Sequence, residues 1–157
     1  MVEIGENMPK LRLADTELAQ VSLPKAAKGK AAVIAFFPGA FTGVCTKEMC
    51  TFRDSIEKLN SLNASLYAIS VDGPFANKAF KEKHSISFPI LSDYKRKAVK
   101  KFGIEFKDFA GLKGYVAAKR AVFIANAQGV VRYKWVSDDP MVEPNYEEIQ
   151  SALLNVA

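Results

Sequence analysis

The sequence is poor in the side chains that bind metal ions, since its 157 residues include only two cysteines and one histidine. A structural zinc site needs four such ligands, and His84 lies far along the chain from both Cys45 and Cys50. We therefore expect no metal site and no other bound cofactor. In a reducing compartment, a pair of cysteines is more often catalytic or metal-binding than a structural disulfide.

Long apolar runs are missing as well. No segment approaches the roughly 20 residues that a membrane-spanning helix requires, and the start of the chain lacks the basic and apolar regions of an export signal. We expect a cytoplasmic protein with no membrane partner. Hydrophobic residues make up 49% and charged residues 25%, which is ordinary for a globular protein. The length predicts a single domain over residues 1–157.

Negative charge is in short supply, because 22 lysines and arginines stand against 17 acidic residues and give a net charge of +5. A basic surface attracts nucleic acids and anionic membranes, so a basic binding protein is the alternative from a different functional class. The lysines are scattered, however, apart from residues 95–97 and 100–101. These positions spread around a predicted helix that also carries apolar residues, and a solvated helix surface explains them. We expect no nucleic-acid partner.

The hydrophobic pattern predicts alternating strands and helices. The predicted strands cover residues 10–15, 20–23, 31–37, 65–71, 88–91, 120–125 and 130–136. The predicted helices begin after Thr42 and cover residues 74–84, 92–102 and 144–155. On the helix over 74–84, the side chains of Phe75, Ala79 and Phe80 are expected to point inward. Residues 105–119 show no period and predict a long loop, a kind of segment that often serves function.

The order of these elements predicts an α/β sandwich. An N-terminal β-hairpin comes first, and strand–helix–strand units with parallel strands and right-handed crossovers follow. A closing hairpin then makes the central sheet mixed, with helices on both of its faces. This is the arrangement of a thioredoxin-like fold.

The segment from residue 36 to residue 54 carries the strongest chemical signal. Pro38 and Gly39 end a buried strand, and Thr42 is a favourable N-cap for the helix that follows. Cys45 then occupies the third position of that helix, where backbone N–H groups lack partners and the helix dipole is positive. Both effects favour the thiolate, which is the nucleophilic form of cysteine. The segment therefore predicts a reactive cysteine, and a buried inert cysteine is the alternative.

The spacing Pro38-x-x-x-Thr42-x-x-Cys45 resembles the active-site motif of the peroxiredoxins. Far downstream, Arg120-Ala-Val-Phe-Ile124 resembles a strand that this family opens with an arginine. The resemblance implies a thioredoxin-like fold and a thiol-dependent peroxidase that reduces hydrogen peroxide and organic hydroperoxides. It implies further that Cys45 is the peroxidatic nucleophile and becomes a sulfenic acid, and that Pro38 shields its sulfur from water.

Four groups are candidates to donate hydrogen bonds to the reacting atoms. They are the backbone N–H groups of Val44 and Cys45, the Thr42 hydroxyl and the Arg120 guanidinium. Ligands of open α/β folds bind at the carboxyl ends of the strands, whereas Arg120 begins its strand. It reaches the site only if that strand runs antiparallel to the strand over residues 31–37.

Further residues are expected around the pocket. Glu48 and Arg53 either join a charge network with the distant arginine or form a solvated pair on the helix. Phe37, Phe41 and Trp135 either form an apolar collar around the pocket or belong to the core. The candidate residues for substrate binding are therefore Val44, Phe41 and Glu48.

Cys50 lies five residues beyond Cys45. On an ideal helix their Cα atoms are roughly 8.6 Å apart, whereas a disulfide rarely tolerates more than about 7 Å, so the two cannot bond while the helix is intact. The C-x₄-C spacing resembles the PrxQ, or bacterioferritin-comigratory, subgroup, which implies that Cys50 resolves the sulfenic acid as an intramolecular disulfide after local unwinding. The strings Phe41-Thr-Gly-Val-Cys45 and Asp72-Gly-Pro-Phe75 also resemble one-cysteine relatives. In those relatives an external thiol resolves the sulfenic acid.

The remaining functional classes are less well supported. A disulfide oxidoreductase needs C-x-x-C at the start of its helix, which this sequence lacks. The expected partners are a peroxide substrate and a thioredoxin-like or other dithiol reductant. The chain is expected to be a monomer or a homodimer, with a hydrophobic face near Phe41, Phe109 or Tyr115 as a candidate contact. No third cysteine is present to make the disulfide across a dimer that typical two-cysteine relatives use.

Overall fold

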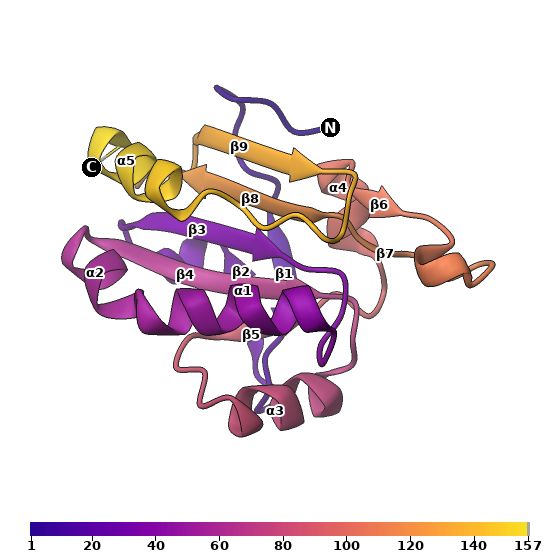
Figure 1. Ribbon diagram of the computed structural model, residues 1–157. Helices are drawn as coiled ribbons and strands as arrows, with labels where there is room; N and C mark the ends of the chain where they lie inside the picture. The colour runs from indigo at the N-terminus through magenta and orange to yellow at the C-terminus, as the bar shows by residue number, and fades with distance from the viewer. Residues whose placement is uncertain (157) are drawn as a thin grey trace.

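A seven-stranded mixed sheet forms the centre of the protein, and the computed structural model describes residues 1–156 (Figure 1). The strand order is β2-β1-β5-β4-β3-β8-β9. The strands of this sheet are β1 (Leu11–Ala14), β2 (Gln20–Leu23), β3 (Ala31–Phe36), β4 (Ala64–Ser70), β5 (Ile90–Ser92), β8 (Arg120–Ala125) and β9 (Val131–Ser137). The helices are α1 (Gly43–Asp54), α2 (Ile56–Ser61), α3 (Pro74–Lys83), α4 (Lys97–Phe102) and α5 (Tyr146–Val156).

The pairing of the strands confirms the predicted topology. Strands β3, β4 and β5 run parallel, and β1 and β2 form the N-terminal antiparallel hairpin. Strand β8 runs antiparallel to β3, with Phe36 opposite Ala121, and β9 continues the antiparallel edge. The start of β8 therefore lies beside the end of β3, as the prediction for Arg120 required.

Two hydrophobic cores cover the two faces of the sheet. Every residue of β3 is buried, which is typical of a central parallel strand, and its side chains alternate between the cores. Val33 and Ala35 pack in the core that includes residues of α1, α3 and α5, whereas Ile34 and Phe36 pack in the core that includes α4. The expected helices on both faces are confirmed.

The structure departs from the predicted elements at two helices. The helix after Thr42 breaks at Ser55 into α1 and α2. On α3, Phe80 is buried as expected, but Phe75 is 75% exposed and Ala79 is also exposed. Asn77 takes the inward position instead, because the Ser70 hydroxyl on β4 donates a hydrogen bond to its side-chain oxygen.

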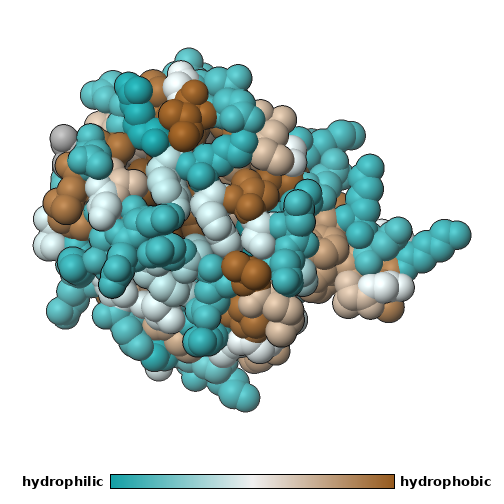
Figure 2. All heavy atoms as spheres, turned by 45° about the horizontal axis from the view of Figure 1, so that its top comes forward, coloured by the Kyte–Doolittle hydropathy of each residue, from teal (hydrophilic) through white to brown (hydrophobic). Residues whose placement is uncertain are grey.

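The segment predicted as a loop contains structure of its own. Strands β6 (Glu105–Phe106) and β7 (Ala117–Ala118) pair as a small second sheet, and the turn η2 (Phe109–Gly111) lies between them. This segment projects from the body of the molecule at the right of Figures 1 and 2. Among the described residues, every helix is too short or too polar to span a lipid bilayer.

Candidate active site

Cys45 lies in the first turn of α1, just beyond the carboxyl end of β3. Thr42 is the N-cap residue, and its carbonyl accepts the first helical hydrogen bond from the N–H of Thr46 at 2.9 Å. The Thr42 hydroxyl does not cap the helix. It donates to the Gly39 carbonyl at 2.7 Å and so closes the loop that leads into the helix.

The loop before α1 is fixed from two directions. The Asp72 carboxylate, which follows β4, accepts a hydrogen bond of 2.8 Å from the Ala40 N–H. The next residue, Phe41, adopts a left-handed backbone conformation with φ of 65°, which costs a side-chain-bearing residue energy unless its surroundings hold it. The loop therefore presents the start of α1 in one orientation at the carboxyl end of β3.

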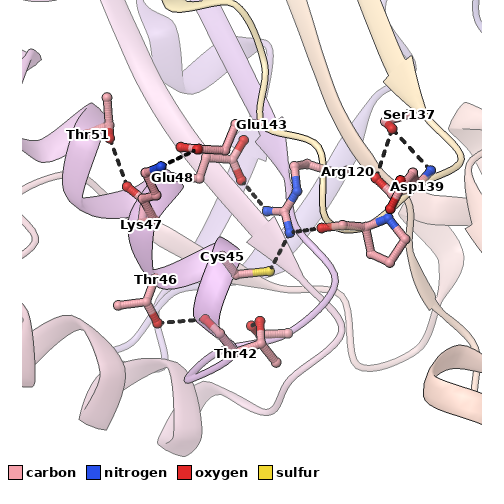
Figure 3. A network of polar contacts seen from close by, with 12 residues as sticks. Thr42, Cys45, Thr46, Lys47, Glu48, Thr51, Arg120, Ser137, Asp139 and Glu143 are labelled. Carbon is pink, nitrogen blue, oxygen red and sulfur yellow. Dashed lines mark hydrogen bonds and ion pairs between the residues drawn. The ribbon is translucent and has the colours of Figure 1, made fainter.

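Arg120 joins the thiol to a buried carboxylate, as Figure 3 shows. Its Nη2 lies 3.1 Å from the Cys45 sulfur, and its Nη1 donates to Glu48 Oε1 at 2.8 Å. Nη2 also donates to the Pro140 carbonyl at 2.7 Å. Arg120 is 1% exposed and Glu48 is fully buried. The guanidinium is thus held from three sides, with one nitrogen directed at the sulfur.

Burial affects the ionisation of Glu48 more than that of Arg120. Burial raises the pKa of Glu48 to about 7, although the charge of Arg120 works in the opposite direction. Burial also opposes the charge on Arg120, but Glu48 and Cys45 together outweigh it and raise the pKa of Arg120. Arg120 therefore remains a cation, whereas Glu48 carries only part of a negative charge near neutral pH. The positive charge of Arg120 therefore faces the Cys45 sulfur at 3.1 Å.

A cavity of about 610 Å³ opens at the cysteine. Its lining residues are Pro38, Thr42, Gly43, Val44, Cys45, Lys47, Phe106, Asp108, Phe109, Ala110, Gly111, Arg120, Pro140 and Met141. Five of the expected site residues, Pro38, Thr42, Val44, Cys45 and Arg120, meet at this cavity. Its wall is mostly apolar, so water competes weakly for the charged groups at its base.

Of the two interpretations of the aromatic residues, the core alternative is confirmed for Phe37 and Trp135, and none of the three residues lines the cavity. Phe37 is buried against Phe80, and Phe41 is half exposed with its ring edge-on to the same phenylalanine at 5.3 Å. Trp135 packs against the core that includes α5, away from the cavity lining. The residues that take the place of the collar are Phe106, Phe109 and Met141. They come from the segment over 105–119 and from the chain after β9, and only the length of the first gave a signal in the sequence.

Glu48 contacts Arg120, whereas Arg53 does not. Glu48 does not line the cavity, because it lies behind the guanidinium of Arg120. Arg53 stays outside this network, pairs with Asp54 and donates to the carbonyl of His84. The charge network predicted for Glu48 is therefore present, and the one for Arg53 is absent.

Both cysteines are free thiols. Cys45 is buried at 1% exposure and Cys50 is half buried on the same intact helix. This is the reduced arrangement, in which the helix keeps the two sulfurs apart. Among residues 1–156, no three side chains of the metal-binding types gather closely enough to hold an ion.

The fold and this site together define a thioredoxin-like protein that holds one thiol against a buried arginine. Residues 4–134 match the AhpC/TSA family, and the chain belongs to this family. The resemblance seen in the Pro38–Cys45 motif is thereby confirmed.

Named relatives agree with this assignment. The chain is 37% identical over 131 residues to a chloroplastic peroxiredoxin Q of Suaeda salsa, a match that covers 83% of this chain and 58% of the plant protein. It is 31% identical over 134 residues to a putative peroxiredoxin bcp of Coxiella burnetii, with 85% and 88% covered. The crystal structure of peroxidoxin BcpB from Mycobacterium tuberculosis superposes with a TM-score of 0.88 at 25% identity and covers 100% of this chain and 99% of that one.

Proposed function

We propose that this chain is a thiol-dependent peroxidase that reduces hydrogen peroxide and organic hydroperoxides. The observation that carries the proposal is the contact of 3.1 Å between Arg120 Nη2 and the Cys45 sulfur at the base of an open cavity. The relatives named peroxiredoxin support it, although the chain spans about 58% of the length of the plant proteins that it matches.

Peroxide reduction takes place at the Cys45 sulfur. The Cys45 thiolate attacks the terminal oxygen of the peroxide, an S–O bond forms and the O–O bond breaks. The leaving oxygen takes the electron pair of that bond and a proton from solvent, which replaces the one lost when the thiol ionised, and departs as water or an alcohol. Cys45 becomes a sulfenic acid. Negative charge spreads over sulfur and both oxygens in the transition state, and Arg120 is already placed to stabilise it.

Cys50 is the proposed resolving thiol. It attacks the sulfenic acid of Cys45, releases water and forms an intramolecular disulfide, which a dithiol donor such as a thioredoxin-like protein reduces. Because the helix separates the two residues by roughly 8.6 Å between Cα atoms, this step requires α1 to unwind.

The sequence of α1 lowers the free energy needed to unwind it. The hydroxyls of Thr46, Thr51 and Ser55 each donate to the carbonyl four residues earlier, a local bond that competes with and weakens a helix. Met49 and Phe52 are buried and anchor the middle of the helix. The first turn and a half around Cys45 is therefore the part that we expect to open, after the bond to Arg120 is lost.

Mass spectrometry of the protein after one equivalent of peroxide tests both steps. The expected spectrum shows the loss of two hydrogens from the wild type and an internal 45–50 bridge after digestion. Cys45→Ser should gain nothing and consume no peroxide, and retained consumption would refute the assignment. Cys50→Ser should gain one oxygen at the wild-type rate and then stall.

The same spectra separate the alternatives. If the wild type keeps one added oxygen and turns over only with an added monothiol, the chain is a one-cysteine peroxidase. A dimer that digestion shows to be linked from Cys45 of one chain to Cys50 of the other would show that Cys50 acts between chains.

A further inference from the structure

A second cavity of about 910 Å³ lies at the β1–β2 edge of the sheet, whereas Cys45 follows the interior strand β3. It is bordered by the hairpin β1–β2, the turn that follows it and the chain from Ser92 through α4. No residue lines both this cavity and the one at Cys45. Its volume is within the range of pockets that hold small molecules, so the chemistry of its wall decides what it binds.

Positive charge dominates that wall. Six cationic side chains line the cavity and all six are exposed, namely Lys10, Arg12, Lys25, Lys95, Lys97 and Lys101. Within the described part of the chain, none of the six forms an ion pair with a carboxylate. We call the cavity that these six residues line the basic groove. Its charge has no partner within the protein and is available to an anion.

The one carboxylate in the lining is already occupied. Asp93 is 1% exposed, and its two oxygens accept hydrogen bonds from the backbone N–H groups of Ala98 at 3.0 Å and Val99 at 2.9 Å. It therefore serves the start of α4 and leaves the lysines unneutralised. Lys101 is the most constrained of them, because its Nζ donates to the Lys10 carbonyl at 2.9 Å.

The groove also offers surface for a flat or apolar group. Leu11, Leu23 and Pro24 belong to its lining, as does the ring of Tyr94, which is 48% exposed. The Lys95 ammonium lies 5.8 Å from the centre of that ring. An aromatic ring beside cations suits a ligand that combines a stacking base with phosphates.

We propose that the basic groove binds a nucleoside polyphosphate, with the phosphate chain among the six cations and the base against Tyr94. The cationic run over 95–101 alone is explained by a solvated helix surface. The fold changes this interpretation, because it adds Lys10, Arg12 and Lys25 from separate segments to the same cavity. A bounded cavity of this volume matches a nucleotide rather than a continuous nucleic-acid strand, which needs a track across the surface.

Isothermal titration with ATP, tripolyphosphate and adenosine tests the proposal on the intact protein. We expect saturable binding of ATP, weaker binding of tripolyphosphate and none of adenosine. The double variant Arg12→Glu/Lys97→Glu should weaken ATP binding by about tenfold or more, since each substitution removes a charge-assisted hydrogen bond to phosphate. Tyr94→Ala should weaken ATP to the level of tripolyphosphate.

The matched control is the double variant Lys58→Glu/Lys83→Glu, whose sites are exposed and outside the groove. Each substitution to glutamate changes the charge by two, so both double variants carry +1 in place of +5. Equal weakening in the two variants would reduce the effect to net charge and overturn the site. Absence of saturable ATP binding overturns it as well, and so does an oligonucleotide that binds more tightly than ATP. Circular dichroism of each variant shows that it is folded.

Discussion

The two cavities of this protein use positive charge in opposite ways. At Cys45 a single guanidinium is 1% exposed, and its terminal nitrogens bond a carboxylate, a carbonyl and a sulfur. In the basic groove six cations are exposed and lack ion-pair partners among the described residues. The first arrangement fixes one charge at one atom, and the second sums many charges over a volume.

This difference has a physical consequence. A buried charge is poorly screened, and because it acts on one reacting atom, a displacement of about 1 Å lowers the rate strongly. Exposed charges are screened over about 8 Å at physiological salt and are partly interchangeable. The cavity at Cys45 is therefore suited to chemistry at a single bond, and the groove is suited to holding a polyanion.

Replacement of Arg120 should give the largest effect among substitutions that keep the thiol. Arg120→Lys retains a positive charge but loses the paired nitrogens that contact Glu48 and the sulfur. We expect the rate of sulfenic acid formation to fall by about 10²–10³, the usual cost of one lost donor to a developing negative charge. Stopped-flow measurement with hydrogen peroxide checks this, with the exposed Arg132→Lys on β9 as the control. A rate within a few-fold of the wild type would show that position matters less than charge.

Glu48 gives the next largest effect, on stability. Its folded-state pKa of about 7 is above its usual value of 4.5, so the folded protein holds this proton more tightly than the unfolded chain does. The resulting stability is full below pH 4.5 and is lost as the pH rises through 7. At about 1.4 kcal/mol for each pKa unit, the loss is roughly 3 kcal/mol at most.

Urea unfolding between pH 4.5 and pH 8 measures this contribution. We expect the free energy of unfolding of the wild type to decline with pH more steeply than that of Glu48→Gln, which does not titrate. The exposed Glu147→Gln on α5 should follow the wild type. Parallel curves for wild type and Glu48→Gln would show that the buried pair does not shift the titration of this carboxyl.

The loop at residues 38–42 is expected to respond more weakly. Asp72→Ala removes the acceptor for the Ala40 N–H, which costs about 1 kcal/mol of stability when a single hydrogen bond is lost. The start of α1 then has more freedom, and we expect a several-fold slower reaction with peroxide. Asp72→Asn keeps an oxygen acceptor and should restore most of the rate; a rate as low as that of the alanine variant would mean that the charge of Asp72 acts in another way.

The sequence predicted what local pattern and a family motif determine. Strands β2 and β8 have the predicted limits residue for residue, because polar and apolar residues alternate in β2 and an apolar run follows Arg120 in β8. The approach of Arg120 to Cys45 was conditional on an antiparallel β8, and the pairing of Phe36 with Ala121 supplies it.

What the sequence could not predict depends on contacts between distant segments. Phe75 points outward because a hydrogen bond from Ser70 turns Asn77 inward, and no helical period contains that bond. Phe109 and Met141 surround the cavity only after two irregular segments fold over it. Lys10 and Lys97 are far apart in the chain, and they line one cavity only because the fold brings their two segments together. The sequence pattern contains no signal for that contact.

Salt should produce the smallest effect at Cys45 and a large one in the groove. The screening length falls from roughly 10 Å at 0.1 M to about 3 Å at 1 M salt, but ions do not enter between Arg120 and a sulfur that lies 3.1 Å away in a buried site. We expect the rate with hydrogen peroxide to change by less than about twofold over this range, because an uncharged molecule is not steered by distant charge.

ATP binding in the groove should weaken by about tenfold or more over the same range, since exposed cations lose their long-range attraction. Stopped-flow kinetics and titration calorimetry on one preparation measure the two. A peroxide rate that falls in parallel with ATP affinity would mean that the surface charge of the whole protein, rather than the buried guanidinium, governs reactivity at Cys45.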